Sequence, residues 1–559
     1  MLHTIIRPNT YQDSVSLMLL SKQLSGLDEV ERVSIMMGTP ANKDIFRDTG
    51  FGTPELDRAG AGDMVIVVDA DSADAASLVD KKITDFLTNQ KAASSSNSFT
   101  TVRSLGRAME VLPQANLALV SIPGEQAAPE IERVLDAGMN AFVFSDNIAI
   151  EDEVRLKSKA RDLGLLMMGP DCGTGSFAGL PLAFTNIVRR GSIGIVGASG
   201  TGTQEIMVQI DRAGSGVSQA IGLGGRDLSE KVGAITCLQA LEALDADPGT
   251  KVITLVSKPP APSVREKVLG RCQQLSKPVV AILLGERAPK AVNGNIHFAD
   301  TLEDAARIAV SLAGPADVVV PTLKAGQSKI TGLFCGGTLA NEAALMVAAE
   351  LGVPTDAAHV DGYMLHHDGH TIIDLGDDKY TQGRPHPMID PSLRAQMIEQ
   401  AFDNEALAVL LFDVVTGYGS NLDPAGAIAP AIERGLAKAR AAGREVAVVA
   451  SVCGTENDPQ PRSGQEAMLR NIGVIVLDSN AAAARFAIGI AKTAGRAGSN
   501  TRVPEPTRRL ISEAPQIVNI GLPSFAEALN SEGASVVQYT WSPLAGGNTR
   551  LQKILAVLG

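Results

Sequence analysis

Residues 193–205 combine the residue types that often bind a phosphate group. They read Ile-Gly-Ile-Val-Gly-Ala-Ser-Gly-Thr-Gly-Thr-Gln-Glu, an apolar run that passes through small residues into a helical pattern. Glycines let the backbone approach a ligand closely, and free N–H groups at a helix start attract anions. Thr201 and Gln204 also have the spacing of a capping box. We predict a phosphate site at Ser199, Gly200, Thr201, Gly202 and Thr203, although a turn that only packs helix on sheet would have the same spacing.

The same signal recurs in residues 332–342. They read Gly-Leu-Phe-Cys-Gly-Gly-Thr-Leu-Ala-Asn-Glu, again an apolar run, a glycine corner and an amphipathic helix. Two helix starts that face one anion would stabilise its charge without a basic surface. We therefore predict a second phosphate-binding element at Gly336, Gly337 and Thr338.

Four further glycine or proline corners lie at residues 38–43, 169–175, 222–227 and 257–260. Ligands of open α/β sheets bind at the carboxyl ends of strands, so these corners could share one crevice. For each corner, a plain turn is the alternative. The residues that we predict to contact substrate are Asn42, Lys43, Cys172, Gly224 and Gly225, and Arg226 is a candidate catalytic residue.

Residues 359–386 hold five of the seven histidines, including the run His-His-Asp-Gly-His at 366–370. The run is compatible with a metal site, but we predict none. Residues 383–391 (Gly-Arg-Pro-His-Pro-Met-Ile-Asp-Pro) read as a rigid loop whose prolines aim Arg384 and His386, the other two candidate catalytic residues. Arg384 would clamp a carboxylate or phosphate, or is an ordinary surface charge.

Two cysteines, Cys172 and Cys335, occupy strand-to-helix corners where a thiolate could be stabilised. The alternative is that both are small buried side chains. The five cysteines are widely spaced and form no close pair, which favours the cytosol over an oxidising compartment.

Charge and hydropathy exclude several classes of partner. The 559 residues include 62 acidic and 49 basic ones, a net charge of −13, which gives no general attraction to nucleic acid or anionic lipid. No signal-peptide pattern opens the sequence, and no apolar run reaches the roughly 20 residues that cross a bilayer. We predict a cytoplasmic protein that binds neither nucleic acid nor membrane.

Short apolar runs alternate with helical patterns along the chain, which predicts an α/β fold of parallel strands and crossover helices. Flavodoxin-like units are expected at 191–314 and 330–498, with a linker at 315–329 between them. Residues 1–190 form a first domain, and 499–559 add a strand–helix–strand module. The expected strands are 33–37, 64–68, 117–122, 141–144, 165–168, 193–196, 252–256, 279–283, 331–335, 408–415, 446–452 and 474–477.

Several of these segments resemble a known family in order and spacing. Residues 169–174, 193–201, 221–226 and 277–285 resemble the alpha subunit of succinyl-CoA synthetase, and residues 330–490 resemble the C-terminal domain of its beta subunit. The whole chain resembles the FdrA proteins, which fuse these two parts. The resemblance implies that residues 1–190 are a Rossmann-like domain of the CoA-binding type. The segments that also match FdrA proteins are 36–43, 144–147, 383–391 and 541–548.

The sequence departs from the ligase pattern at its active site. The ligase alpha subunit carries a histidine in a Gly-His-Ala-Gly-like loop, whereas residues 286–297 here read Glu-Arg-Ala-Pro-Lys-Ala-Val-Asn-Gly-Asn-Ile-His. His297 lacks the flanking glycines of a phosphohistidine loop. The ATP-grasp region is missing too, because only residues 313–329 separate the two ligase-like parts. We therefore do not expect an autonomous ATP-dependent ligase.

FdrA-type proteins are associated with purine and allantoin breakdown as one subunit of oxamate carbamoyltransferase. The resemblance implies conversion of oxalurate and phosphate into oxamate and carbamoyl phosphate, within a complex of several different subunits. The two helix starts would hold phosphate, and Arg226 or Arg384 would bind the oxamate carboxylate. No cofactor is obligatory, although CoA could bind.

Two alternatives remain open. One is an acyl-CoA synthetase that keeps CoA binding in its first domain and borrows a nucleotide-binding subunit. The other is a scaffold or regulatory subunit whose crevice senses a metabolite.

Overall fold

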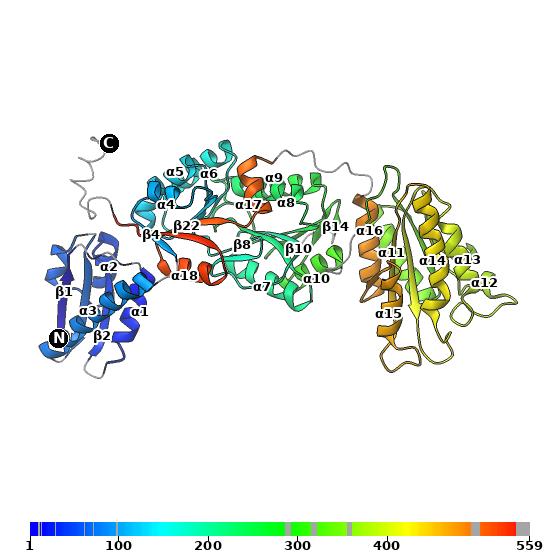
Figure 1. Cartoon of the computed structure of the whole chain (residues 1–559), viewed down its shortest axis with the longest axis horizontal. Coiled ribbons are helices and arrows are strands. Elements are labelled where there is room, and N and C mark those ends of the chain that lie inside the picture. The colour runs from blue at the N-terminus through cyan, green and yellow to red at the C-terminus, as the bar shows by residue number, and fades with distance from the viewer. Residues whose placement is uncertain are drawn as a thin grey trace. The chain divides into compact units, whose positions relative to one another are not determined.

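The computed structural model shows two compact units, residues 1–172 with 513–559, and residues 173–512 (Figure 1). Part of the predicted linker at 315–329 falls outside the described residues. His359, residues 286–291 and the tail beyond 543 lie outside them entirely. No helix of the described chain is both long and apolar enough to span a membrane. The described residues are 1–8, 10, 12, 14–27, 30–60, 62–70, 72–96, 99–285, 292–314, 321–354, 360–493 and 503–543.

The N-terminal sheet is antiparallel, which corrects the prediction of parallel strands at 33–37 and 64–68. β3 (Met64–Ala70) lies between β1 (Leu2–Arg7) and β2 (Val30–Met37). Side chains of β3 alternate between two cores, so both faces are covered. The helices on one face are α1 (Ser14–Leu24) and α3 (Ala73–Ser96), and those on the other are α2 (Pro40–Asp48) and η1 (Pro54–Arg58).

A second sheet of the same unit joins strands from both ends of the chain. Its order is β4-β23-β22-β5-β6-β7, and all its pairs are parallel. The predicted C-terminal strand–helix–strand module exists, but it supplies the centre of this sheet instead of standing apart. The strands are β4 (Thr100–Val102), β5 (Leu117–Val120), β6 (Asn140–Val143), β7 (Met167–Met168), β22 (Gln516–Ile520) and β23 (Ser535–Tyr539).

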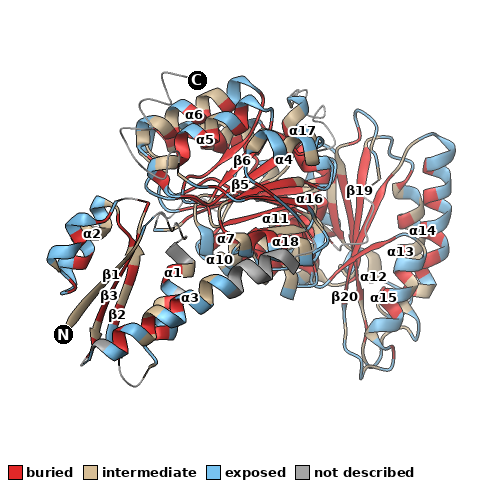
Figure 2. Ribbon diagram, turned by 60° about the vertical axis from the view of Figure 1, so that its left-hand side comes forward, coloured by how far each residue is buried: buried red, intermediate tan, exposed pale blue. Residues whose placement is uncertain are grey.

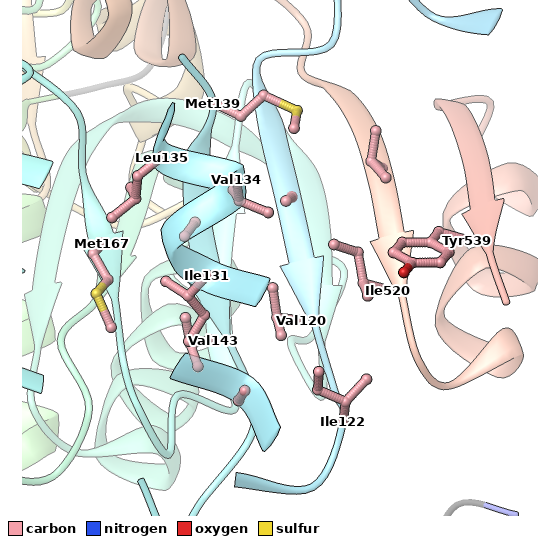
Figure 3. Close-up of a cluster of buried hydrophobic side chains, with 14 of the residues drawn as sticks. Val120, Ile122, Ile131, Val134, Leu135, Met139, Val143, Met167, Ile520 and Tyr539 are labelled. Carbon is pink, nitrogen blue, oxygen red and sulfur yellow. The ribbon is translucent and has the colours of Figure 1, made fainter. Parts of the chain in front are cut away.

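If β22, β23 and β4 are numbered 1, 2 and 3, and β5, β6 and β7 are numbered 4, 5 and 6, the sheet has the 3-2-1-4-5-6 order of a Rossmann fold. Ile520 and Tyr539 pack in one core with Val120 and with Ile131 (Figure 3). Buried apolar contacts between the two chain ends therefore hold the sheet together. Its helices are α4 (Leu105–Val111), α5 (Gly124–Asp136), α6 (Ile150–Asp162) and α18 (Pro523–Ser531).

The second unit contains two more sheets, and the first has the order β14-β15-β13-β12-β10-β11-β8-β9. Its central strands are parallel, and the β8–β9 hairpin closes one edge. The strands are β8 (Thr174–Phe177), β9 (Leu180–Ala183), β10 (Arg190–Gly197), β11 (Val217–Gly222), β12 (Val252–Ser257), β13 (Val279–Leu283), β14 (Val292–Asn293) and β15 (Ile296–Phe298). The helices are α7 (Gly200–Arg212), α8 (Ile235–Ala246), α9 (Pro262–Gln274), α10 (Leu302–Ala313) and α17 (Glu505–Ser512).

The other sheet of this unit has the order β17-β18-β16-β19-β20-β21 and is parallel except for β17. Its strands are buried between helices on both faces (Figure 2). The strands are β16 (Lys329–Phe334), β17 (Tyr363–His367), β18 (His370–Asp374), β19 (Leu407–Val415), β20 (Ala447–Cys453) and β21 (Ile475–Leu477). The helical segments are α11 (Gly337–Leu351), η2 (Val360–Gly362), α12 (Asp378–Thr381), α13 (Ser392–Ala401), α14 (Pro424–Ala441), α15 (Arg462–Asn471) and α16 (Asn480–Thr493). The α/β class with parallel-sheet domains is confirmed.

We predict that Ile520→Ala destabilises the first unit by roughly 2–5 kcal/mol, because it leaves a cavity in the central strand β22. Trp541 is the single tryptophan and is buried in the same core, so its fluorescence reports this unfolding in denaturant. Leu163→Ala, at a half-exposed side chain of the same unit, is the control. An unchanged midpoint for Ile520→Ala would contradict a central position of β22.

Candidate functional site

The start of α7 is capped by Ser199. Its Oγ accepts a hydrogen bond from the Gly202 N–H at 3.3 Å, and its carbonyl accepts from the Thr203 N–H at 2.9 Å. The predicted capping box of Thr201 and Gln204 is therefore wrong. Gln204 instead donates from Nε2 to the Phe184 carbonyl at 2.7 Å, which ties α7 to the preceding loop.

The phosphate-site residues predicted at this corner have two different roles. Thr203 is buried and donates its hydroxyl to the Ser199 carbonyl, and a Cβ at Gly197 would lie 2.0 Å from the Thr203 hydroxyl. Gly197 and Thr203 thus serve packing. Gly200 and Thr201 are exposed, and within the described chain no acceptor binds their N–H groups. These two amides, at the positive end of α7, can receive an anion.

A buried carboxylate of the protein lies beside the start of α11 and binds the backbone just before the helix. Asp413 is fully buried, and its two oxygens accept the N–H groups of Cys335 and Gly336, both at 2.8 Å. Arg394 lies 3.5 Å from the same carboxylate and donates to the Asp413 carbonyl. An anion at this helix start would have to compete with Asp413.

A second carboxylate, Asp374, lies against the same corner. A Cβ at Gly337 would lie 2.5 Å from its Oδ2, so this position needs glycine to make room for the protein's own side chain. Burial raises the pKa of Asp374, and the negative charges of Asp377 and Asp413 raise it further. The predicted phosphate site at Gly336, Gly337 and Thr338 is thus surrounded by negative charge.

The two helix starts are not packed together in the second unit. Among the described helices, α7 packs on α10, α10 on α16, and α16 on α11. The structure therefore gives no support to one anion held between α7 and α11.

The candidate residue Arg226 lies at the same sheet edge as the α7 start. Its corner follows β11, and the Leu223 N–H donates to the Gly197 carbonyl at 2.8 Å, which joins the two corners. Gly224 is buried and Gly225 is exposed, while Arg226 is half-buried. The sequence correctly brought the corners at 193–205 and 222–227 together.

Three predicted substrate residues belong to the first unit. Asn42 donates from Nδ2 to the Met37 carbonyl at 2.9 Å, and Lys43 donates from Nζ to the Ala59 carbonyl at 2.6 Å. Both side chains thus hold α2 on its own sheet. Cys172 is buried beyond β7.

Neither Cys335 nor the histidine run gains a chemical role. Burial, with Asp413 nearby, raises the pKa of the Cys335 thiol, which supports the description of Cys335 as a small buried side chain. His370 accepts the Ile330 N–H on Nδ1 at 3.2 Å, which links β18 to β16. Within the described ranges, no three His, Cys, Asp or Glu side chains are placed to hold a metal ion.

Arg384 and His386 lie in the loop between α12 and α13. His386 accepts the Met388 N–H on Nδ1 at 3.2 Å, and its charge acts to lower the pKa of Asp374. Arg384 is exposed at the wall of a hollow of about 340 Å³. The His386 ring lies beside Gly376, which follows β18.

The sequence did not reveal the switch point of the Rossmann-ordered sheet. There the chain leaves β22 and β5 in opposite directions, the place where such sheets bind ligands. The Leu522 N–H donates to the Ser121 hydroxyl at 2.8 Å, and a Cβ at Gly521 would lie 2.5 Å from the Ser121 carbonyl. The two corners that form this point lie 399 residues apart in sequence, so no local motif signals it.

Comparison with known proteins assigns the chain to a family. It is 43% identical over 498 residues to the uncharacterized protein YahF of Escherichia coli, covering 85% of this chain and 96% of the relative. The chain belongs to the YahF family. Family models described as CoA binding domain and CoA-ligase match residues 188–285 and 333–490, so it is a succinyl-CoA synthetase-like protein. The CoA binding model thus covers the α7 corner and not residues 1–190, where the family resemblance places the CoA-binding-type domain.

A third family model, described as AllF, heavy metal-associated domain, matches residues 1–102 of this YahF-family chain. These residues contain no cysteine and only one histidine, His3. Soft metals prefer thiolate and imidazole ligands, so this segment does not fit a heavy-metal site. The matched residues include the antiparallel sheet of β1, β2 and β3 and the helices that cover it.

More distant relatives cover less of the chain. The succinate–CoA ligase alpha subunit 1 of Archaeoglobus fulgidus is 30% identical over 183 residues, which span 31% of this chain and 60% of that protein. A dinucleotide-forming acetyl-coenzyme A synthetase of Ca. Korarchaeum cryptofilum aligns in structure with a TM-score of 0.45 and 17% identity, over 68% of this chain and 84% of the other.

His297 is buried on β15, where it pairs with Val280 near the start of β13. Burial lowers its pKa to about 4, and Lys492 and Arg485 add to the effect. A folded pKa below the ordinary 6.5 means that stability is complete above pH 6.5 and falls as the pH drops towards 4. We predict a loss of roughly 3 kcal/mol from this histidine over that window.

Circular dichroism unfolding in denaturant at pH 7 and pH 4.5 measures this loss. The difference between wild type and His297→Gln should shrink as the pH falls, whereas that for the exposed His366→Gln should stay constant. A pH-independent difference at His297 would show that it titrates normally.

Proposed function

We propose that this protein is a group-transfer subunit of the acyl-CoA synthetase type that holds an acyl phosphate at the start of α7. The observation that carries the proposal is the pair of exposed N–H groups of Gly200 and Thr201, which no acceptor within the described chain occupies. The CoA binding domain model covers this corner. The start of α11, by contrast, lies beside the carboxylates of Asp413 and Asp374, which oppose a second anion there.

In this reaction α7 has to stabilise only the charge on the departing phosphate. An acceptor attacks the acyl carbon, the bond from that carbon to the phosphate oxygen breaks, and phosphate leaves. Two N–H groups and the positive end of the helix stabilise the charge that develops on the phosphate. The chain's net charge of −13 does not oppose this, because the stabilisation is local.

CoA is the acceptor that the comparisons favour. Its thiol would lose a proton to solvent and form the new carbon–sulfur bond. The family model described as CoA binding domain matches residues 188–285, which include the α7 corner.

One observation favours a second candidate, carbamoyl transfer from oxalurate to phosphate with release of oxamate. The β22 corner has Leu522 and Pro523 where a diphosphate-binding loop would offer free amides. The Leu522 N–H is taken by Ser121, and proline has none. A reaction without CoA does not need these amides.

Removing one amide tests the α7 site. Gly200→Pro deletes the first N–H, and the extended backbone of Ser199 (φ −131°, ψ 115°) accepts a following proline at this first helical position. Losing a hydrogen bond to a charged group should cost about 1.5–3 kcal/mol, which weakens inorganic phosphate binding by roughly 10- to 100-fold. Calorimetry measures the change.

Gly200→Ala is the matched control. It keeps the N–H, and its Cβ would meet only the Thr174 hydroxyl at 3.4 Å, an ordinary contact. Equal phosphate affinity in the two variants would show that the Gly200 N–H does not bind phosphate.

Two turnover assays distinguish the acceptors, each with the chain alone and with co-purified partners. Acetyl-CoA formation from acetyl phosphate and CoA would establish the first candidate. In that case CoA at 100 times its dissociation constant should stabilise the protein by about 2.7 kcal/mol, read by circular dichroism in denaturant. Phosphate-dependent loss of oxalurate would establish the second. Failure of both reactions would leave a sensing or scaffold role and contradict the proposal.

A further inference from the structure

Three large apolar side chains are exposed to solvent on two loops of the sheet of residues 329–477. Tyr418 is 93% exposed and Leu422 is 84% exposed, both in the loop after β19, and Ile389 is 56% exposed in the loop between α12 and α13. Single exposed apolar residues are ordinary on protein surfaces, whereas apolar side chains gathered on adjoining segments mark interaction sites. We call Ile389, Tyr418 and Leu422 the apolar patch.

The two loops that carry the apolar patch are bonded to each other and to a third loop. Asn421 donates its N–H to the Met388 carbonyl at 2.7 Å and its Nδ2 to the Ile389 carbonyl at 3.2 Å. The buried Gln460, from the loop after β20, donates to the Asn421 carbonyl at 2.8 Å and accepts the Gly417 N–H at 3.0 Å. The loop after β19 is therefore fixed to both of its neighbours.

The backbone around Tyr418 turns on both sides of this residue. Gly417 has φ 118° and Gly419 has φ 84°, a region that residues with a side chain rarely adopt. At its high exposure the Tyr418 ring contributes almost nothing to the core. A tyrosine held on a fixed loop loses little conformational entropy on binding, and tyrosine is enriched among the residues that dominate interface energies.

The surroundings of the apolar patch are acidic. Residues 383–391, 416–423 and 454–460, the three joined loops, contain four carboxylates and a single Lys or Arg, which is Arg384. Three of the carboxylates are exposed, and within the described chain their oxygens bond only to neutral groups. These three, which we call the acidic rim, are Asp390, Asp423 and Glu456.

The acidic rim distinguishes between occupants of the patch. A two-fold interface with a second copy places the same surface against itself, so carboxylates would face carboxylates. Nucleic acid and anionic lipid would be repelled in the same way. A protein surface with an apolar pocket among Lys and Arg side chains is complementary both to the apolar centre and to the rim.

We propose that the apolar patch is a docking surface for a different protein, whose apolar pocket takes the Tyr418 ring and whose Lys and Arg side chains face the acidic rim. This inference goes beyond the proposed function, because it concerns association and does not involve α7. It also gives a role to the loop after β19, which acyl transfer at α7 does not use.

Cys453 can report on this surface. It is the last residue of β20, and its carbonyl accepts the Thr416 N–H at 3.1 Å, at the base of the loop that carries Tyr418. Of the five cysteines, all of which lie within the described residues, Cys453 alone is exposed. N-ethylmaleimide should therefore label Cys453 selectively, and mass spectrometry measures the rate both in the purified chain and in the cells that naturally produce it.

We expect wild type to be labelled at least tenfold more slowly than Tyr418→Ser in these cells, because the docked protein covers Cys453. The two should be labelled equally when purified. Asp390→Lys should also speed labelling in cells, because it repels a basic partner. Leu345→Ser, at a leucine of α11 that is 52% exposed, is the control and should behave as wild type. Circular dichroism checks that each variant is folded.

Equal labelling of wild type and Tyr418→Ser in the cells would overturn the proposal. Slow labelling of purified wild type that becomes faster on dilution would overturn it too, because the occupant would then be a second copy. An unchanged rate for Asp390→Lys would contradict a basic partner. Gly200→Pro should not alter the labelling of Cys453, so a failure at α7 and a failure here are distinguishable.

Discussion

Every strand-to-helix corner of this fold leaves backbone N–H groups that must find an acceptor, and the way each corner meets this need decides which corner can bind a ligand. At α8, Asp227 accepts the N–H groups of Thr236 and Cys237. At α11, Asp413 accepts those of Cys335 and Gly336. At α7, the cap is the neutral Ser199, which leaves the amides of Gly200 and Thr201 exposed. A buried carboxylate beside a helix start opposes a second anion, whereas the neutral serine cap of α7 leaves the attraction of the helix start in place.

This division shows how a protein with a net charge of −13 can keep one helix start attractive to an anion. Asp374 and Asp413 make the α11 corner negative. The pKa of Asp374 is raised, first by burial and then by the negative charges of Asp377 and Asp413. The same sheet presents Arg384 only at its rim, beside Asp390. The two ligase-like sheets share a fold but have different electrostatics, so equivalent glycine motifs do not imply equivalent ligands.

The amino-acid sequence predicted the parallel sheets well, because buried strands such as β12 and β19 are continuous apolar runs followed by glycine corners. It was wrong about β2 and β3, since an apolar run of seven residues does not reveal strand direction. The Rossmann order was hidden because β22 and β5 come from opposite ends of the chain. The carboxylate at α11 was also missed, although Asp413 inside an apolar strand is a signal that such a residue must be bonded to buried donors.

The central claim is that α7 alone, of the two glycine-motif helices, presents an open anion site. Amide hydrogen–deuterium exchange with and without saturating inorganic phosphate tests it directly, because bound N–H groups exchange more slowly. We predict added protection in peptides that contain residues 199–203 and none in peptides that contain residues 335–338. Protection at residues 335–338, or no change at residues 199–203, would contradict the account.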